Sequence, residues 1–97
     1  DNQVVHFGSA KYDLKKNIII KDNNCLAVTS SEGKLLGYLL NKKNELVERD
    51  ELSDILGVNI RSVDVQINRL RGKIEDNPKQ PLFLQSVRGK GYILYVD

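Results

Sequence analysis

The segment from Ile60 to Glu75 restricts the possible fold more than any other part of the sequence. On a helix, its apolar side chains recur every three or four residues and form one stripe. The members of this stripe are Ile60, Val63, Ile67, Leu70 and Ile74. The opposite side carries cations, amides and a single valine. The segment therefore predicts a helix with one side in a core and a cationic side outside it.

A second basic segment lies at 87–92, where the sequence reads VRGKGY. Its two glycines and two cations stand between apolar alternating runs at 82–87 and 92–96, a pattern typical of a tight hairpin turn between two strands. A basic helix beside a basic hairpin would fit a DNA groove and its flanking phosphates.

The first part of the chain predicts four short strands. Apolar or alternating runs at 4–7, 10–14, 17–21 and 25–29 are separated by short links. Gly8 ends the first run, and Asp22, Asn23 and Asn24, which favour a turn, separate the last two. Such short links favour an antiparallel meander, with one face packed on helices. The single cysteine, Cys25, lies in the fourth run, where we expect a small core residue.

Two further helices are expected between these strands and the cationic helix. Thr29 and Glu32 have the spacing of a capping box and precede a leucine run, which predicts a helix over about 30–42. The next helix is predicted over 49–56, with acidic residues in its first turn. The turn 57–59, which contains Gly57, then leads into the cationic helix. Two helices joined by a short glycine-containing turn are typical of a helix-turn-helix.

Length and charge are compatible with a single small DNA-binding domain. The chain has 97 residues, enough for one modest core. Its net charge of +2 is a weak signal, but residues 61–91 hold 7 Lys and Arg against 3 Asp and Glu, while the rest of the chain is net negative. Such a local excess of cations would attract phosphates or form a solvated basic face. No apolar run approaches the roughly 18 residues of a membrane-spanning helix, so no membrane partner is expected. Because Met is absent throughout, we expect a piece of a longer protein.

Together these segments resemble the winged-helix DNA-binding domain of OmpR/PhoB-type response regulators. The resemblance covers nearly all of residues 1–97 and is most specific at 61–73 (RSVDVQINRLRGK) and 87–92 (VRGKGY). It implies an α+β fold: a winged helix-turn-helix with an N-terminal four-stranded antiparallel sheet, three helices and a C-terminal β-hairpin wing. It also implies sequence-specific binding of double-stranded DNA for transcription regulation, as the effector domain of a bacterial two-component system in the cytoplasm.

The resemblance implies partners as well. A phosphorylatable receiver domain would precede this one and connect it to a sensor histidine kinase through a phosphorelay. The domain would bind direct-repeat half-sites as a tandem homodimer. RNA polymerase is a further implied partner, through the loop between the second and third helices. That loop is short here, at 57–59, and the chain has no Trp.

The resemblance and the helical spacing together indicate a set of DNA-binding residues. On the third helix these are Arg61, Ser62, Val65, Gln66, Asn68, Arg69, Arg71 and Lys73, and on the wing they are Arg88, Gly89 and Lys90. Arginine pairs with guanine through two hydrogen bonds, side-chain amides pair with adenine, and valine contacts the thymine methyl group.

Structural roles compete with DNA contact at some of these positions. Ser62 could cap the helix or bond a phosphate, and the two roles are compatible. Arg71 lies near the buried edge of the helix and could instead pair with Asp64. The wing cations could serve only for solubility. Tyr92 is expected to pack the wing rather than to stack on a base.

The main alternative function is a winged-helix protein-interaction module without specific DNA binding. An enzyme has less support, because the only histidine, His6, has no Asp or Cys cluster at ligand spacing. Ser30 and Ser31 lack a nearby base, and no nucleotide-binding glycine loop is present in the sequence. We therefore expect no catalytic residue, no cofactor and no metal.

Overall fold

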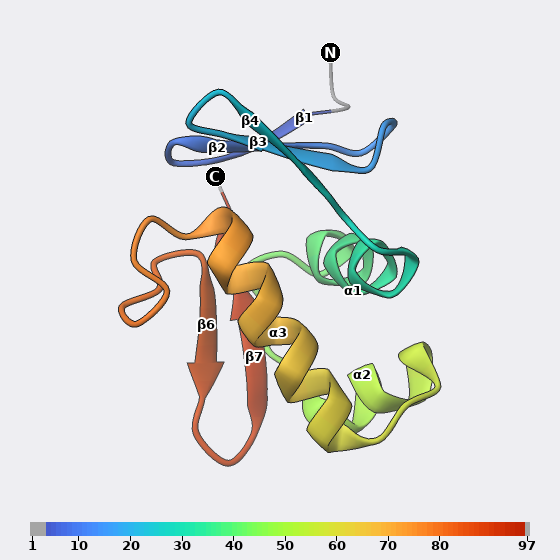
Figure 1. The fold of residues 1–97 in the computed structure, drawn as a ribbon. Helices are drawn as coiled ribbons and strands as arrows, with labels where there is room; N and C mark the ends of the chain where they lie inside the picture. Colours follow the sequence, from blue (N-terminus) through green and yellow to red (C-terminus); the bar gives the residue numbers. More distant parts are fainter. Residues whose placement is uncertain (1–3, 97) are drawn as a thin grey trace.

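The computed structural model describes residues 4–96 and places two sheets and three helices in one fold (Figure 1). The first seven elements are β1 (Val4–Phe7), β2 (Ala10–Asp13), β3 (Ile18–Lys21), β4 (Asn24–Ala27), α1 (Ser30–Asn41), β5 (Val47–Glu48) and α2 (Arg49–Leu56). They are followed by α3 (Ile60–Ile74), β6 (Leu84–Val87) and β7 (Gly91–Leu94). The fold class predicted from the sequence is confirmed.

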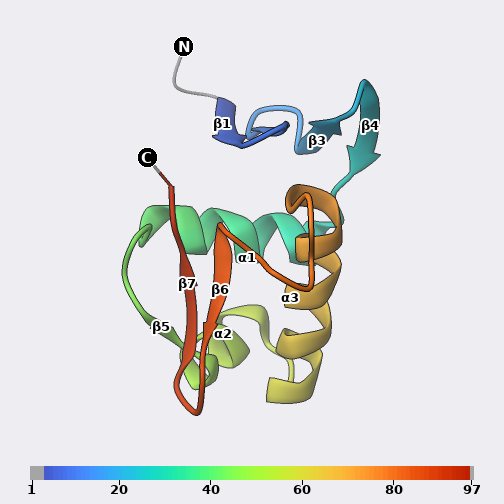
Figure 2. The same ribbon diagram turned by 90° about the vertical axis from the view of Figure 1, so that its left-hand side faces the viewer.

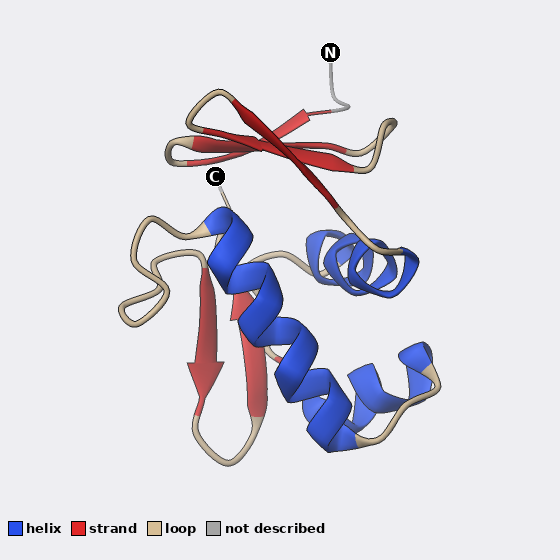
Figure 3. Ribbon diagram, viewed as in Figure 1, coloured by secondary structure: helices blue, strands red, loops and turns tan. Residues whose placement is uncertain are grey.

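The first four strands form an antiparallel meander in the order β1-β2-β3-β4. Figure 3 shows this sheet as a separate layer, above the helices and the second sheet. Its buried side chains include Phe7, Tyr12 and Ile19, and β2 and β3 contact α3. The sheet therefore closes the core at the C-terminal end of α3.

Cys25 is exposed, so the expectation that it is a core residue was wrong. It lies on β4, an edge strand on which all residues except Leu26 are exposed. Leu26 is partly buried against the core, whereas Cys25 and Ala27 on either side are exposed. Side chains of neighbouring residues on a strand point to opposite faces, and the pairing register puts Cys25 on the outer one.

The first helix begins with the predicted capping box. The Thr29 hydroxyl accepts from the backbone N–H of Glu32, and the Glu32 carboxylate accepts from the N–H of Thr29, both at 3.1 Å. The Glu32 side chain is 3% exposed and also receives the Lys73 ammonium of α3 at 2.7 Å. This ion pair joins the start of α1 to the last turn of α3.

The second and third helices form the predicted helix-turn-helix. Gly57 ends α2 with φ of 68°, a left-handed conformation that glycine adopts without strain. Asn59, rather than Ser62, caps α3: its side-chain oxygen accepts from the backbone N–H of Ser62 at 2.8 Å. The capping role considered for Ser62 is therefore corrected, because Ser62 lies three residues inside the helix end.

The second sheet has three strands in the order β5-β7-β6, so the wing is more than the predicted two-stranded hairpin. The short strand β5 pairs with β7 through Val47 and Glu48. A Cβ atom on Gly91 would lie 2.1 Å from the carbonyl oxygen of Val47, so this close pairing requires glycine there. Figure 2 shows β6 and β7 extending beside the helices, with their connecting turn far from the four-stranded sheet.

The Glu32–Lys73 pair predicts a pH dependence of stability. Burial by itself would raise the pKa of Glu32, but hydrogen bonds from Lys73 and Thr29 outweigh it and hold that pKa below its ordinary value of 4.5. A carboxylate with a lowered pKa contributes stability above its unfolded pKa and loses that contribution as the pH falls through the folded pKa. We expect Glu32→Gln to lower the free energy of unfolding by about 1–3 kcal/mol at pH 7.

Urea denaturation at a series of pH values would measure this effect. The difference between wild type and Glu32→Gln should shrink steadily as the pH falls below 4.5. The exposed Glu45 gives a control, because Glu45→Gln should change neither the free energy of unfolding nor its dependence on pH. A difference between wild type and Glu32→Gln that stays constant down to acid pH would show that the charge of Glu32 is not the cause.

Candidate nucleic-acid interface

One face of α3 is open to solvent and cationic. The core side chains Val63, Ile67, Leu70 and Ile74 are fully buried. On the opposite face, Arg61, Val65, Asn68, Arg69 and Gly72 are all exposed, and Val65 keeps 44% of its surface accessible. We call these five residues the α3 face. The helical stripe thus places two guanidinium groups, an amide and a valine methyl surface together, as its spacing predicts.

Arg71 does not belong to this face. Its guanidinium donates to the carbonyl oxygen of Leu84 at 2.9 Å and to the hydroxyl of Ser86 at 2.6 Å, both on β6. The pairing with Asp64 considered from the sequence is wrong, because Asp64 is already paired with Arg49. Arg71 instead holds the wing against the edge of α3.

Lys73, Gln66 and Ser62 lie on the other edge of α3, which the helical spacing places away from the wing. The Lys73 ammonium is engaged by Glu32 and by the Ala27 carbonyl, at 2.7 and 2.8 Å. The amide oxygen of Gln66 is buried and has no hydrogen-bond partner among residues 4–96. Gln66 would thus reach a base edge only after its side chain rotates outward, and Ser62 is half-buried.

The wing tip carries the remaining predicted residues. Gly89 has φ of 74°, and the backbone N–H of Lys90 donates to the carbonyl of Val87 at 3.0 Å, which closes the turn. Arg88, Gly89 and Lys90 are exposed. Figures 1 and 2 both place this turn at the end of the molecule where α3 begins. The two basic segments therefore lie on the same end, away from the four-stranded sheet.

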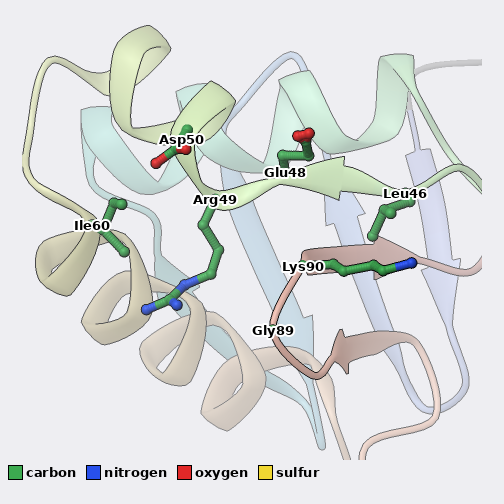
Figure 4. Close-up of a pocket in the computed structure, with 7 residues that line it drawn as sticks. All are labelled: Leu46, Glu48, Arg49, Asp50, Ile60, Gly89 and Lys90. Atoms are coloured by element: carbon green, nitrogen blue, oxygen red, sulfur yellow. The ribbon is translucent and has the colours of Figure 1, made fainter.

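A pocket of about 490 Å³ separates the wing tip from the start of α3 (Figure 4). Ile60, Gly89, Lys90 and Arg49 line it, together with Leu46, Glu48 and Asp50. The Arg49 side chain points toward α3, whereas Lys90 points away from it. Sequence reasoning did not include Arg49 in the site, because its position at the start of α2 carries no local sign of closeness to the wing.

Asp64 connects the wing, α2 and α3. It accepts hydrogen bonds from the Arg49 guanidinium at the start of α2 and from the Tyr92 hydroxyl on β7, the latter at 2.6 Å. Burial alone would raise the pKa of Asp64, but the hydrogen bonds from Arg49 and Tyr92 hold that pKa below its ordinary value. Burial and the bond to Asp64 raise the pKa of Tyr92 to about 12. Asp64 is therefore ionised and Tyr92 neutral at physiological pH.

This surface offers cations and hydrogen-bond donors to a ligand. Among residues 4–96, no three His, Cys, Asp or Glu side chains gather as a metal site would require. Within the same range, no helix is long and apolar enough to cross a membrane. The exposed groups are hydrogen-bond donors and cations, which phosphates and base edges accept.

Comparison with known proteins identifies the family of this chain. A family model described as "Transcriptional regulatory protein, C terminal" matches residues 23–94. Protein PetR of Rhodobacter capsulatus is 36% identical over 100 aligned residues, which cover 93% of this chain and 42% of PetR. The chain thus spans less than half the length of this relative.

Two solved structures share the fold. Response regulator DrrB of Thermotoga maritima, described as an OmpR/PhoB homolog, has a TM-score of 0.83 and 26% identity, over 96% of this chain and 44% of DrrB. The RstA DNA-binding domain of Klebsiella pneumoniae, solved in complex with the RstA box, has a TM-score of 0.75 and 30% identity. That match covers 97% of this chain and 98% of the RstA domain.

Proposed function

Since the chain belongs to the family of C-terminal domains of transcriptional regulatory proteins, we propose that its α3 face and its wing bind double-stranded DNA sequence-specifically. The domain is a winged-helix DNA-binding effector domain of the response-regulator kind and not an enzyme. In the proposed complex, the α3 face enters the major groove while the wing tip approaches the adjacent backbone.

The observation that carries this proposal is that the two basic segments lie at the same end of the molecule. Arg61 and Arg69 project from a face of α3 that the rest of the described chain leaves exposed, and Arg88 and Lys90 stand at the same end of the molecule. The cations neutralise phosphates and release counterions, which supplies affinity. Arg69, Asn68 and Val65 then discriminate among base edges.

Arg71 and Lys73 are left out of the proposed direct contacts, because their charged groups are bound within the protein. Gln66 and Ser62 act at the margin of the surface: Gln66 reads a base after its side chain rotates, and Ser62 bonds a phosphate. Gly89 contributes through its backbone, which lets the wing approach the duplex closely.

The larger protein is also part of the proposal. The match covers 44% of the response regulator DrrB, which leaves room in such a chain for a receiver domain preceding this one. We infer that a sensor histidine kinase phosphorylates that receiver in the cytoplasm. The phosphorylated protein would bind direct-repeat half-sites as a tandem homodimer and would act on RNA polymerase.

Selection of bound duplexes from a random pool, at a stated salt concentration, tests the proposed function. We expect enrichment of one half-site, repeated in the same orientation at a spacing near one helical turn of DNA. If no sequence is enriched and binding barely responds to salt, a protein-interaction module is the better reading of the fold.

The wing gives a separate prediction. Arg88→Ala should reduce the slope of log affinity against log salt by about one unit, because one phosphate contact is lost. Lys16→Ala removes the same charge from the turn between β2 and β3, at the other end of the molecule, and should leave the slope unchanged. Equal slopes for wild type and Arg88→Ala would mean that the wing does not touch the backbone.

A further inference from the structure

The wing is held to the rest of the domain by a closed set of hydrogen bonds that passes through one acidic side chain. The backbone N–H of Arg49 donates to the carbonyl of Lys90 at the wing tip, at 3.3 Å. The guanidinium of the same Arg49 donates to Asp64 on α3. Asp64 also accepts from the hydroxyl of Tyr92, which lies two residues beyond Lys90.

The position of the wing depends on such contacts because its own strands are short. Each of β6 and β7 has four residues, and β5 adds only two paired residues. A two-stranded hairpin is marginally stable alone in water. Arg71 holds β6 and places its guanidinium 5.6 Å from the centre of the Tyr92 ring. Asp64 holds β7 through the Tyr92 hydroxyl.

Asp64 also lies beside the proposed DNA-reading residues. Arg61 precedes it by three residues and Asn68 follows it by four, so both are its neighbours on the surface of the helix. A fully unpaired carboxylate at this position would repel DNA phosphates. The carboxylate is ionised, a third of its side chain is exposed, and its hydrogen bonds go to the wing and to α2.

We propose that Asp64 is a positioning residue for DNA binding, which sets the distance between the wing tip and the α3 face by holding Tyr92 and Arg49. This inference rests on the proposed function, because it assumes that both surfaces engage one duplex. With the wing fixed before binding, its cations reach the backbone without a further loss of conformational freedom. Without Asp64, each binding event would have to order the wing.

Simple electrostatics makes the opposite prediction. Asp64→Ala removes a negative charge from a DNA-facing helix, so charge alone would strengthen binding and steepen its salt dependence. A positioning role predicts that the same substitution weakens the contribution of the wing. Tyr92→Phe is the milder variant, because it removes one hydroxyl, preserves the charge and keeps the ring under Arg71.

The chain contains a matched control. Glu51 on α2 accepts hydrogen bonds from the Tyr38 hydroxyl and from the Lys42 ammonium, the latter at 3.0 Å. This is the same combination of tyrosine, carboxylate and cation, but it joins α1 to α2 and does not involve the wing. Tyr38→Phe therefore removes an equivalent hydrogen bond without changing how the wing is held.

The first test measures whether the contribution of Arg88 to DNA affinity depends on the hydroxyl of Tyr92. Affinity for a mixed-sequence DNA duplex at low salt is determined for Arg88→Ala, alone and combined with Tyr92→Phe or with Tyr38→Phe. We expect Arg88→Ala to weaken binding about fivefold in the wild-type and Tyr38→Phe backgrounds, and less than about twofold with Tyr92→Phe. The same loss in all three backgrounds would overturn the proposal.

The second test needs no DNA, so it separates this proposal from the proposed function. Nitroxide labels on Lys34→Cys in α1 and Lys90→Cys at the wing tip, in a Cys25→Ser background, report the wing position by double electron–electron resonance. The distance distribution should broaden or shift with Tyr92→Phe and with Asp64→Ala, and should stay unchanged with Tyr38→Phe. Identical distance distributions in the folded Tyr92→Phe and wild-type proteins would contradict the positioning role, whether or not the domain binds DNA.

Discussion

Glu75→Ala is expected to lower the free energy of unfolding by about 3–5 kcal/mol, a large part of the stability of a domain this small. Glu75 follows the last residue of α3 and is 1% exposed. Its carboxylate accepts the backbone N–H groups of Leu82, Phe83 and Leu84, at 2.8, 2.9 and 2.8 Å. The substitution would leave these three donors without their partner, and a buried unsatisfied donor costs about 1–3 kcal/mol.

The effect of Glu75 reaches the wing because its three donors lie where the chain enters β6. Leu84 is the first residue of that strand and is fully buried. We therefore expect the loss to appear as cooperative unfolding rather than as local loosening. Glu75→Gln should have an intermediate effect, since it replaces one acceptor oxygen by an amide donor that faces other donors.

Chemical denaturation followed by circular dichroism would measure the change, with Glu45→Ala as the exposed control that stays close to wild type. A loss below about 1 kcal/mol for Glu75→Ala would mean that water satisfies the three N–H groups after the change. In that case the carboxylate would not be what joins the end of α3 to β6.

The second large effect is expected at Arg69. Its guanidinium has no hydrogen-bond or ion-pair partner among residues 4–96, and it lies on the α3 face. If it pairs with guanine, Arg69→Ala should weaken binding to the selected duplex by about 1–3 kcal/mol, with discrimination lost at one base pair. The folded domain itself should be as stable as wild type.

Arg69→Lys separates base reading from charge. Lysine keeps the charge but loses the planar pair of donors, so a guanine contact is weakened while a phosphate contact largely survives. Lys43→Ala, an exposed cation after α1, controls for net charge. Unchanged affinity of Arg69→Ala at matched salt would remove Arg69 from the interface, and full retention by Arg69→Lys would make it a phosphate contact.

Much of this fold could be predicted from local patterns. The capping box at Thr29, the left-handed turn at Gly57 and the buried stripe of α3 each depend on residues within about four positions of one another. Such features are decided by backbone geometry and side-chain spacing, which the sequence displays directly. The same spacing predicted that Arg61, Val65, Asn68, Arg69 and Gly72 face the solvent. It also placed Ser62 and Lys73 there, but Ser62 is half-buried and Lys73 is bound to Glu32.

The elements, their order and the exposed cationic side of α3 thus follow from local residue patterns. Which charged groups are free to bind a ligand, and which are held within the protein, depends on how the elements pack together. Lys73 pairs with Glu32 across 41 positions, and Tyr92 reaches Asp64 across 28. The sequence does not show which of several cations pairs with a given carboxylate. The pairing follows from how sheets and helices pack, because a hydrogen bond forms only where packing brings its two atoms to about 3 Å.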